Sequence, residues 1–100
     1  MGNKEIASRN DQLRSKIPSI FPPNVLFLTR GVANLSIEDV SIILKMVKEF
    51  NQFNQDNDPW GEHDFGAFDY KGEKFFWKID DYKGVDGYEL ILTIMFAHEY

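Results

Sequence analysis

The densest group of side chains able to do chemistry lies between residues 56 and 64. It surrounds Trp60 with four carboxylates and one histidine, namely Asp56, Asp58, Glu62, His63 and Asp64. Clustered carboxylates suit a hard cation, and a histidine among them can act as a metal ligand or a general base. One hypothesis is therefore a small metal-dependent hydrolase that uses Asp58, Glu62, His63 and Asp64.

The spacing of this group does not match a known ion-binding loop. The run from Asp56 begins like a calcium loop, but Trp60, after Pro59, stands at the fifth position, where that loop needs a further oxygen ligand. Ala67 stands at the twelfth position, where the loop needs an acid. The chain also has no cysteine, no serine framed by glycines and no phosphate-binding glycine loop. We therefore expect no metal, no cofactor and no catalytic residue, which favours a protein that is not an enzyme.

A structural role accounts for two members of the group. On a strand, His63 and Asp64 would point to opposite sides and would not share one site. Asp58 lies in a segment dense in turn-forming residues, where a carboxylate can accept backbone N–H groups. We expect Asp58 to cap a turn and His63 to make a buried hydrogen bond.

Charge is divided unevenly between the two halves of the chain. Residues 1–50 carry seven Lys and Arg residues against five Asp and Glu residues, a net charge of +2, whereas residues 51–100 carry four lysines against eleven acids, a net charge of −7. Phosphate neutralisation needs clustered basic side chains, so the second half is not expected to bind nucleic acid directly. The excess of acid favours a basic partner, a metal ion or simple solubility.

Aromatic residues are interleaved with acids in the same half. The rings between residues 65 and 82 resemble a platform for single-stranded nucleic acid, but aspartates separate them where such a platform needs basic residues. Most of these rings are expected in the core, and any exposed ring would favour a protein partner. The predicted binding surface comprises Asp56, Asp58, Trp60, Glu62, His63, Asp64, Asp69, Asp80 and Asp81.

Hydrophobic spacing predicts two helices in the first half. Residues 3–16 form a first amphipathic helix that stops before Pro18, and residues 25–29 form a buried strand followed by a turn at Arg30-Gly31. Ser36 is placed to cap a second helix, whose apolar stripe runs along residues 39–53.

The second half is predicted to be mostly strand. Residues 62–70 and 75–82 form a hairpin joined by residues 71–74, and the apolar run 88–98 is read as a central strand rather than a buried helix. The expected fold is a single α+β domain over residues 1–100, with two helices on one face of an antiparallel sheet of three to four strands, in the order α-β-α-β-β-β. No apolar stretch is long enough to span a membrane and no leader is visible, so a cytoplasmic protein without membrane contact is expected.

Three runs of residues carry a resemblance to a known family. DNDPWGEHDFGAF at 56–68, FFWKID at 75–80 and LTIM at 92–95 resemble the bacterial domain of unknown function 3768 family, and the resemblance extends from Asn10-Asp11 and Leu13 to Glu99-Tyr100. It departs at residues 82–90, where relatives carry a longer insertion. The family has no assigned activity. Similar proteins tend to be encoded on bacterial plasmids, phages and integrated elements, which implies a role in conflict between mobile DNA and its host.

The combined interpretation is a non-enzymatic binding protein for a basic protein partner. Carboxylates spaced along a surface can imitate phosphates and occupy a groove built for DNA or RNA. The concrete form is an anti-CRISPR or anti-restriction inhibitor of a nucleic-acid-binding defence complex, and the alternatives are the hydrolase above or a toxin–antitoxin component. The interpretation depends on the carboxylates of residues 51–100 gathering on one side of the fold.

Overall fold

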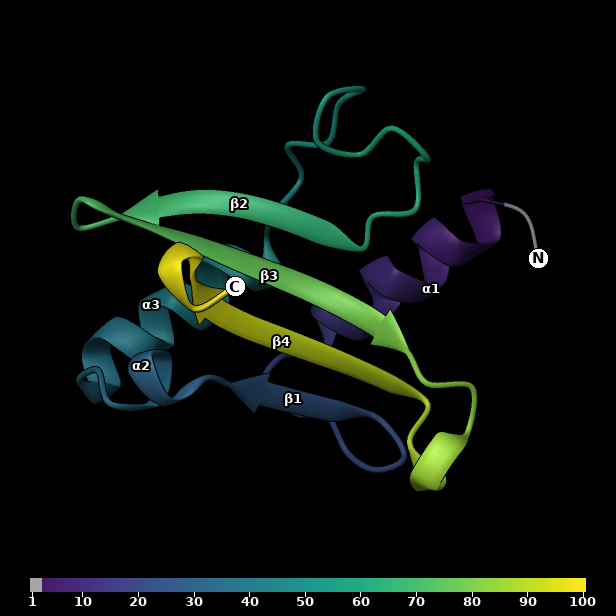
Figure 1. Ribbon diagram of the computed structural model, residues 1–100, viewed down its shortest axis with the longest axis horizontal. Coiled ribbons are helices and arrows are strands. Elements are labelled where there is room, and N and C mark those ends of the chain that lie inside the picture. The colour runs from purple at the N-terminus through teal and green to yellow at the C-terminus, as the bar shows by residue number, and fades with distance from the viewer. Residues whose placement is uncertain (1–2) are drawn as a thin grey trace.

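The computed structural model describes residues 3–100 as a four-stranded sheet with helices on one side (Figure 1). The helices are α1 (Asn3–Ser15), α2 (Arg30–Ala33) and α3 (Ile37–Lys48), and the strands are β1 (Val25–Leu28), β2 (Phe65–Tyr70), β3 (Glu73–Asp81) and β4 (Leu90–Phe96). Two short 3₁₀ turns follow β3 and β4, η1 (Val85–Gly87) and η2 (Ala97–Glu99). No helix in this described part of the chain has the length and apolarity to cross a membrane. The predicted α+β class is confirmed.

The sheet is mixed, so the expectation of an antiparallel sheet is wrong for one strand. The strands lie in the order β1-β4-β3-β2, with β2, β3 and β4 antiparallel and β1 parallel to β4. A parallel pair needs a long connection, and here the chain passes through α2, α3 and the β2–β3 hairpin before β4 returns beside β1. The short apolar run of β1 contains no information about the direction of its neighbour.

Helix α3 is the second helix predicted from the sequence. It begins directly after the predicted Ser36 cap, and it ends before the predicted apolar stripe does. The Ser36 hydroxyl accepts a hydrogen bond from the Asp39 N–H at 3.1 Å, and Ile43 and Val47 are fully buried. The helix ends at Lys48, so Phe50 and Phe53 continue the apolar surface from irregular backbone. The apolar stripe along residues 39–53 therefore predicts a helix that extends further than α3 does. The four-residue helix α2, where only a turn was expected, is an addition.

The β2–β3 hairpin is tighter than predicted. Its register pairs Tyr70 with Glu73, so only Lys71 and Gly72 form the turn, and both have positive φ, at 51° and 79°. Such backbone is typical of the two-residue turns that match the twist of a hairpin. β2 begins at Phe65, so residues 62–64 belong to the preceding loop rather than to a strand.

The core lies between the sheet and the helices. Phe75, Trp77 and Ile79 alternate along β3 on the helix side and are buried, as the sequence predicted for that face. They pack in one cluster with residues of α1, α2, α3 and β4, among them Leu13, Val32, Ile43, Val47, Leu92 and Ile94. None of α1, α2 and α3 lies over the opposite face of the sheet, and only the short turn η2 lies in front of it, at the end of β4 (Figure 1).

Candidate functional site

The loop of residues 51–64 is closed by the carboxylate of Asp58. This side chain is buried, and its oxygens accept the backbone N–H groups of Glu62 at 3.0 Å and of His63 at 3.3 Å. The expected turn-capping role of Asp58 is thus present. Because both its oxygens are engaged inside the protein, the carboxylate does not belong to the accessible surface.

His63 fastens this loop to α1. Its Nδ1 lies 2.9 Å from an oxygen of Asp11, its Nε2 lies 3.6 Å from Asp58, and its ring stacks on Phe53 with centroids 3.8 Å apart. The Asn10 side chain donates to the backbone oxygen of Glu62 at 2.9 Å. His63 therefore links the loop of residues 51–64 to α1, two segments that are far apart in the sequence.

The residues of the hypothetical hydrolase do not converge. His63 lines a groove along α1 with Ser8 and Asp11, whereas Glu62 and Asp64 line a different groove with Arg9. Within residues 3–100, no three side chains of His, Asp or Glu are arranged to hold a metal ion. The separation of His63 from Asp64 agrees with the sequence argument, although both residues precede β2.

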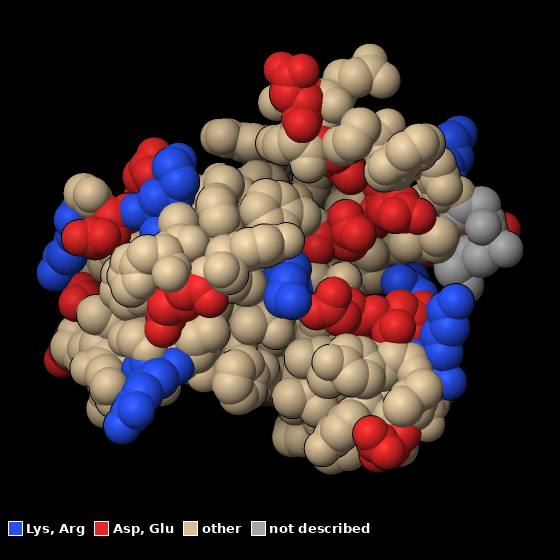
Figure 2. All heavy atoms as spheres, viewed as in Figure 1, with Lys and Arg blue, Asp and Glu red and all other residues tan. Residues whose placement is uncertain are grey.

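Four carboxylates do gather in one place. They line a groove of about 460 Å³ beside α1 at the end of β3, and we call this set the acidic groove: Glu62, Asp64, Asp80 and Asp81. Two basic residues also line it. Arg9 donates to Asp81 at 2.8 Å, and Lys83 follows β3. Figure 2 shows acidic side chains collected at the right of the uncovered face, near the end of β3 in Figure 1.

The charge of Asp64 is disfavoured, chiefly by burial. Burial raises the pKa of this carboxyl above its ordinary value of 3.8, and the nearby charges of Asp58 and Asp80 raise it further. Its backbone oxygen accepts from Ile79, which holds the residue beside β3. The folded protein therefore keeps a carboxylate where its charge is disfavoured, and a cation placed beside it would relieve that cost.

Substituting Asp64 by asparagine is expected to raise stability at neutral pH. The folded protein holds the Asp64 proton more tightly than the unfolded chain, so this group's contribution to stability falls as pH rises from 3.8 through the raised pKa. Asp64→Asn removes the loss of stability that accompanies ionisation of Asp64. Urea denaturation of the variant and the wild type at acidic and neutral pH would measure the difference. Asp81→Asn is the matched control, because the Arg9 pair and the Lys83 N–H lower the pKa of Asp81 against the effect of its burial, so its loss should destabilise at neutral pH. Equal urea midpoints for Asp64→Asn and Asp81→Asn at neutral pH would contradict this interpretation of the two carboxyl groups.

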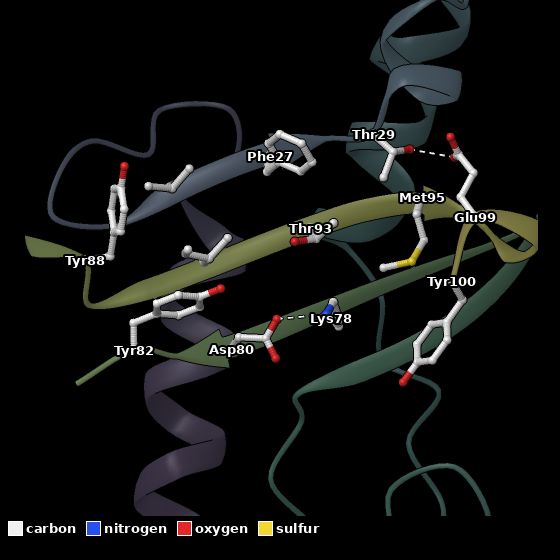
Figure 3. Close-up of a pocket in the computed structure, with 12 residues that line it drawn as sticks. Phe27, Thr29, Lys78, Asp80, Tyr82, Tyr88, Thr93, Met95, Glu99 and Tyr100 are labelled. Atoms are coloured by element: carbon white, nitrogen blue, oxygen red, sulfur yellow. Dashed lines mark hydrogen bonds and ion pairs between the residues drawn. The ribbon is translucent and has the colours of Figure 1, made fainter. Parts of the chain in front are cut away.

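The uncovered face of the sheet is hollowed into a groove of about 600 Å³. Thr93 and Met95 of β4 lie on its floor, and four aromatic side chains around it keep between 41% and 75% of their surface exposed, namely Phe27, Tyr82, Tyr88 and Tyr100. In Figure 3, Tyr82 and Tyr88 stand at one end and Tyr100 at the other. We call this the aromatic groove. Asp80 lines both it and the acidic groove, so the two grooves are adjacent at this residue.

Glu99 holds the far end of the aromatic groove in place. Its carboxylate accepts hydrogen bonds from the Thr29 hydroxyl at 2.6 Å and from the N–H groups of Gly31 and Phe96, both at 2.9 Å. Burial opposes the charge, but these hydrogen bonds lower the pKa of Glu99 overall. Tyr100 follows directly. The role of Glu99 could not be predicted from the sequence, because two of its three partners, Thr29 and Gly31, lie 70 and 68 positions away.

The remaining predicted residues lie apart from the acidic groove. Asp69 pairs with Lys74 at 3.4 Å near the hairpin turn, at the opposite end of β3 from Asp80, and Asp56 and Trp60 are exposed on the loop. Red side chains at the left and top of Figure 2 show the same separation. The carboxylates of the second half therefore form one local cluster and several isolated charges. The expected gathering of all of them on one side of the fold is wrong, and only the acidic groove presents several carboxylates together.

Comparison with known proteins identifies a family without an activity. A family model described as Protein of unknown function (DUF3768) matches residues 28–90, from the end of β1 to the start of β4. That span contains the loop with Asp58 and His63 and both strands of the hairpin, and α1 lies outside it. No curated protein and no solved structure matches the sequence. The function must therefore be argued from the geometry.

Proposed function

This chain belongs to the DUF3768 family of unknown function, and we propose that it is a non-enzymatic protein whose aromatic and acidic grooves together bind a basic protein partner. The observation that supports the proposal is that exposed rings surround a hollow sheet face which shares Asp80 with a cluster of carboxylates. Exposed aromatic patches of this kind mark interaction surfaces.

The two grooves would contribute different parts of the binding energy. Tyrosine is enriched among the residues that dominate interface energetics, because its ring is large and rigid and its hydroxyl can still hydrogen-bond. Complementary charge chiefly raises the association rate and excludes wrong partners. An arginine or lysine beside Asp64 would also lower the raised pKa of that carboxyl, so binding is expected to strengthen as pH rises through its titration.

The concrete form that we propose is an inhibitor of a nucleic-acid-binding complex, of the anti-CRISPR or anti-restriction kind. Carboxylates of the acidic groove would occupy the place of phosphates, and the exposed rings would occupy the place of bases that stack on the partner. The net charge of −5 would assist the approach to a basic groove. Because the acidic groove is local, it would imitate a short stretch of backbone rather than a long duplex.

The test is capture from a bacterial lysate with matched charge variants. We expect immobilised wild-type protein to retain a partner at low salt and to release it at high salt. The triple variant Glu62→Gln, Asp64→Asn, Asp80→Asn should lose the partner. The control Glu38→Gln, Glu73→Gln removes charge at exposed positions outside both grooves and should keep it.

The aromatic groove is tested in the same assay by Tyr82→Ala and Tyr100→Ala, each of which should weaken capture without changing the folded state seen by circular dichroism. Retention of the same partner by the triple variant, or equal loss in the triple variant and its control, would remove the basis of the proposal.

A further inference from the structure

The outer edge of β2 has free backbone groups. β2 pairs on one side only, with β3, and the register brings Gly66, Phe68 and Tyr70 into the hydrogen-bonded positions next to the two-residue turn. The N–H and C=O groups of the alternate residues Ala67 and Asp69 therefore point away from the sheet. Within residues 3–100, neither residue's backbone has a hydrogen bond to a loop or side chain.

This edge lacks the features that usually prevent strand pairing. Natural edge strands are protected by lysine, proline, a bulge or a covering segment. β2 has the sequence FGAFDY, whose single charge is the exposed Asp69. The middle of the strand therefore presents an unprotected template to another extended chain.

A groove of about 450 Å³ runs beside this edge. Met46 of α3, Phe50 and Phe68 give it apolar walls, and Glu49 and Asp69 give it two carboxylates. No lysine or arginine lines it, although Lys74 of the neighbouring strand pairs with Asp69 at 3.4 Å. We call it the edge groove. A pocket between an edge strand and a helix suits a peptide that adds as a strand, because main-chain hydrogen bonds hold it while alternate side chains enter the pocket.

We propose that the edge of β2 binds an extended segment of a partner protein by strand addition, with an apolar side chain in the edge groove and a lysine or arginine facing Glu49 and Asp69. A second copy of this chain is the less suitable occupant, since β2 carries no basic residue and the same acids would face one another. This surface is separate from both grooves of the proposed function, and neither proposal depends on the other.

The test uses synthetic eight-residue peptides of alternating valine and threonine with one central lysine. Nuclear magnetic resonance should show saturable shifts at Ala67 and Asp69, and their amides, which exchange freely in the unbound protein, should gain protection. Gly66 and Phe68 should be protected throughout by the ladder to β3. Glutamate in place of the lysine should weaken binding about fivefold, the size of one exposed ion pair.

Backbone variants separate strand addition from other contact. Ala67→Pro removes the edge N–H without removing a bond to β3, and binding should fall about tenfold or more. Ala67→Val keeps the N–H and should bind normally. Two peptides, each methylated on one of the two sets of alternate nitrogens, provide a test on the wild-type protein even if Ala67→Pro does not fold. Methylation of the nitrogens that face β2 should abolish binding, and methylation of the other set should leave it unchanged. Equal binding in both registers, or no saturable binding by any peptide, would overturn the proposal.

Discussion

Replacing Arg14 by methionine is expected to lower the free energy of unfolding by about 1–3 kcal/mol, a substantial part of the stability of a domain this size. Arg14 is 4% exposed although it lies on a helix that reads as amphipathic. Its guanidinium donates to the carbonyl oxygens of Val47 at 3.0 Å and Phe50 at 2.8 Å and pairs with Asp11 at 2.8 Å. Removing it leaves the Phe50 carbonyl without its donor, whereas the Val47 carbonyl keeps the Phe50 N–H at 3.3 Å.

The same guanidinium also lies over two rings, 4.8 Å from Trp77 and 5.4 Å from Phe53. Arg14→Lys keeps the charge but loses the planar fork, so most of the destabilisation should remain. Arg9→Met is the matched control, because its pair with Asp81 is partly exposed and should be worth about 0–1 kcal/mol. Urea denaturation followed by tryptophan fluorescence measures all three. Similar losses for Arg14→Met and Arg9→Met would contradict this account.

Substituting Gly66 by alanine is expected to destabilise the protein by about 1–3 kcal/mol through overpacking. A Cβ at this position would lie 2.2 Å from Nε1 of Trp77 and 2.9 Å from the ring of Phe50. The Trp77 ring is fully buried, its Nε1 has no hydrogen-bond partner among the described residues, and Nε1 and Cε2 are the indole atoms nearest to a Cβ at position 66. Either Trp77 must turn or β2 must move away from the core.

A double-mutant cycle tests this cause. Alanine at position 66 should cost less in a Trp77→Phe background, because the smaller ring leaves room, and the interaction energy should be about 0.5–3 kcal/mol. Ala67→Val, which adds methyl groups to the next residue of the same strand on its half-buried side, should change stability by about 0.5 kcal/mol or less. Purely additive costs at positions 66 and 77 would show that contact with Trp77 is not the reason.

Elements with strong local signals could be predicted from the sequence. The first helix and the Ser36 cap were found because one hydroxyl and a few apolar spacings decide such elements. β4 was read as a central strand because it is apolar on both faces, and it lies between β1 and β3. The hairpin was found and only its turn was misjudged, since Lys71 with positive φ is less recognisable than glycine.

Contacts between distant segments could not be predicted. The burial of Arg14 on the first helix could not be predicted, because nothing in the neighbouring sequence shows that its guanidinium meets the end of α3. His63 contacts Asp11, which lies 52 positions earlier. Asp80 lies near Asp64 because of the register of β2 and β3. No spacing in the sequence indicates either of these two contacts. Of the exposed rings around the aromatic groove, only Tyr82 belongs to the aromatic run between residues 65 and 82 that the sequence singles out. Phe27, Tyr88 and Tyr100 were missed, because which rings remain uncovered depends on the helices packing on the other face of the sheet.

The most direct test of the proposed function is displacement of nucleic acid from the captured partner. Labelled DNA or RNA bound to that partner would be titrated with this protein and followed by fluorescence anisotropy. We expect wild-type protein and the Glu38→Gln, Glu73→Gln control to displace the nucleic acid in proportion to the partner present, and the Glu62→Gln, Asp64→Asn, Asp80→Asn variant to leave it bound. A partner that holds this protein and its nucleic acid at the same time would contradict the account.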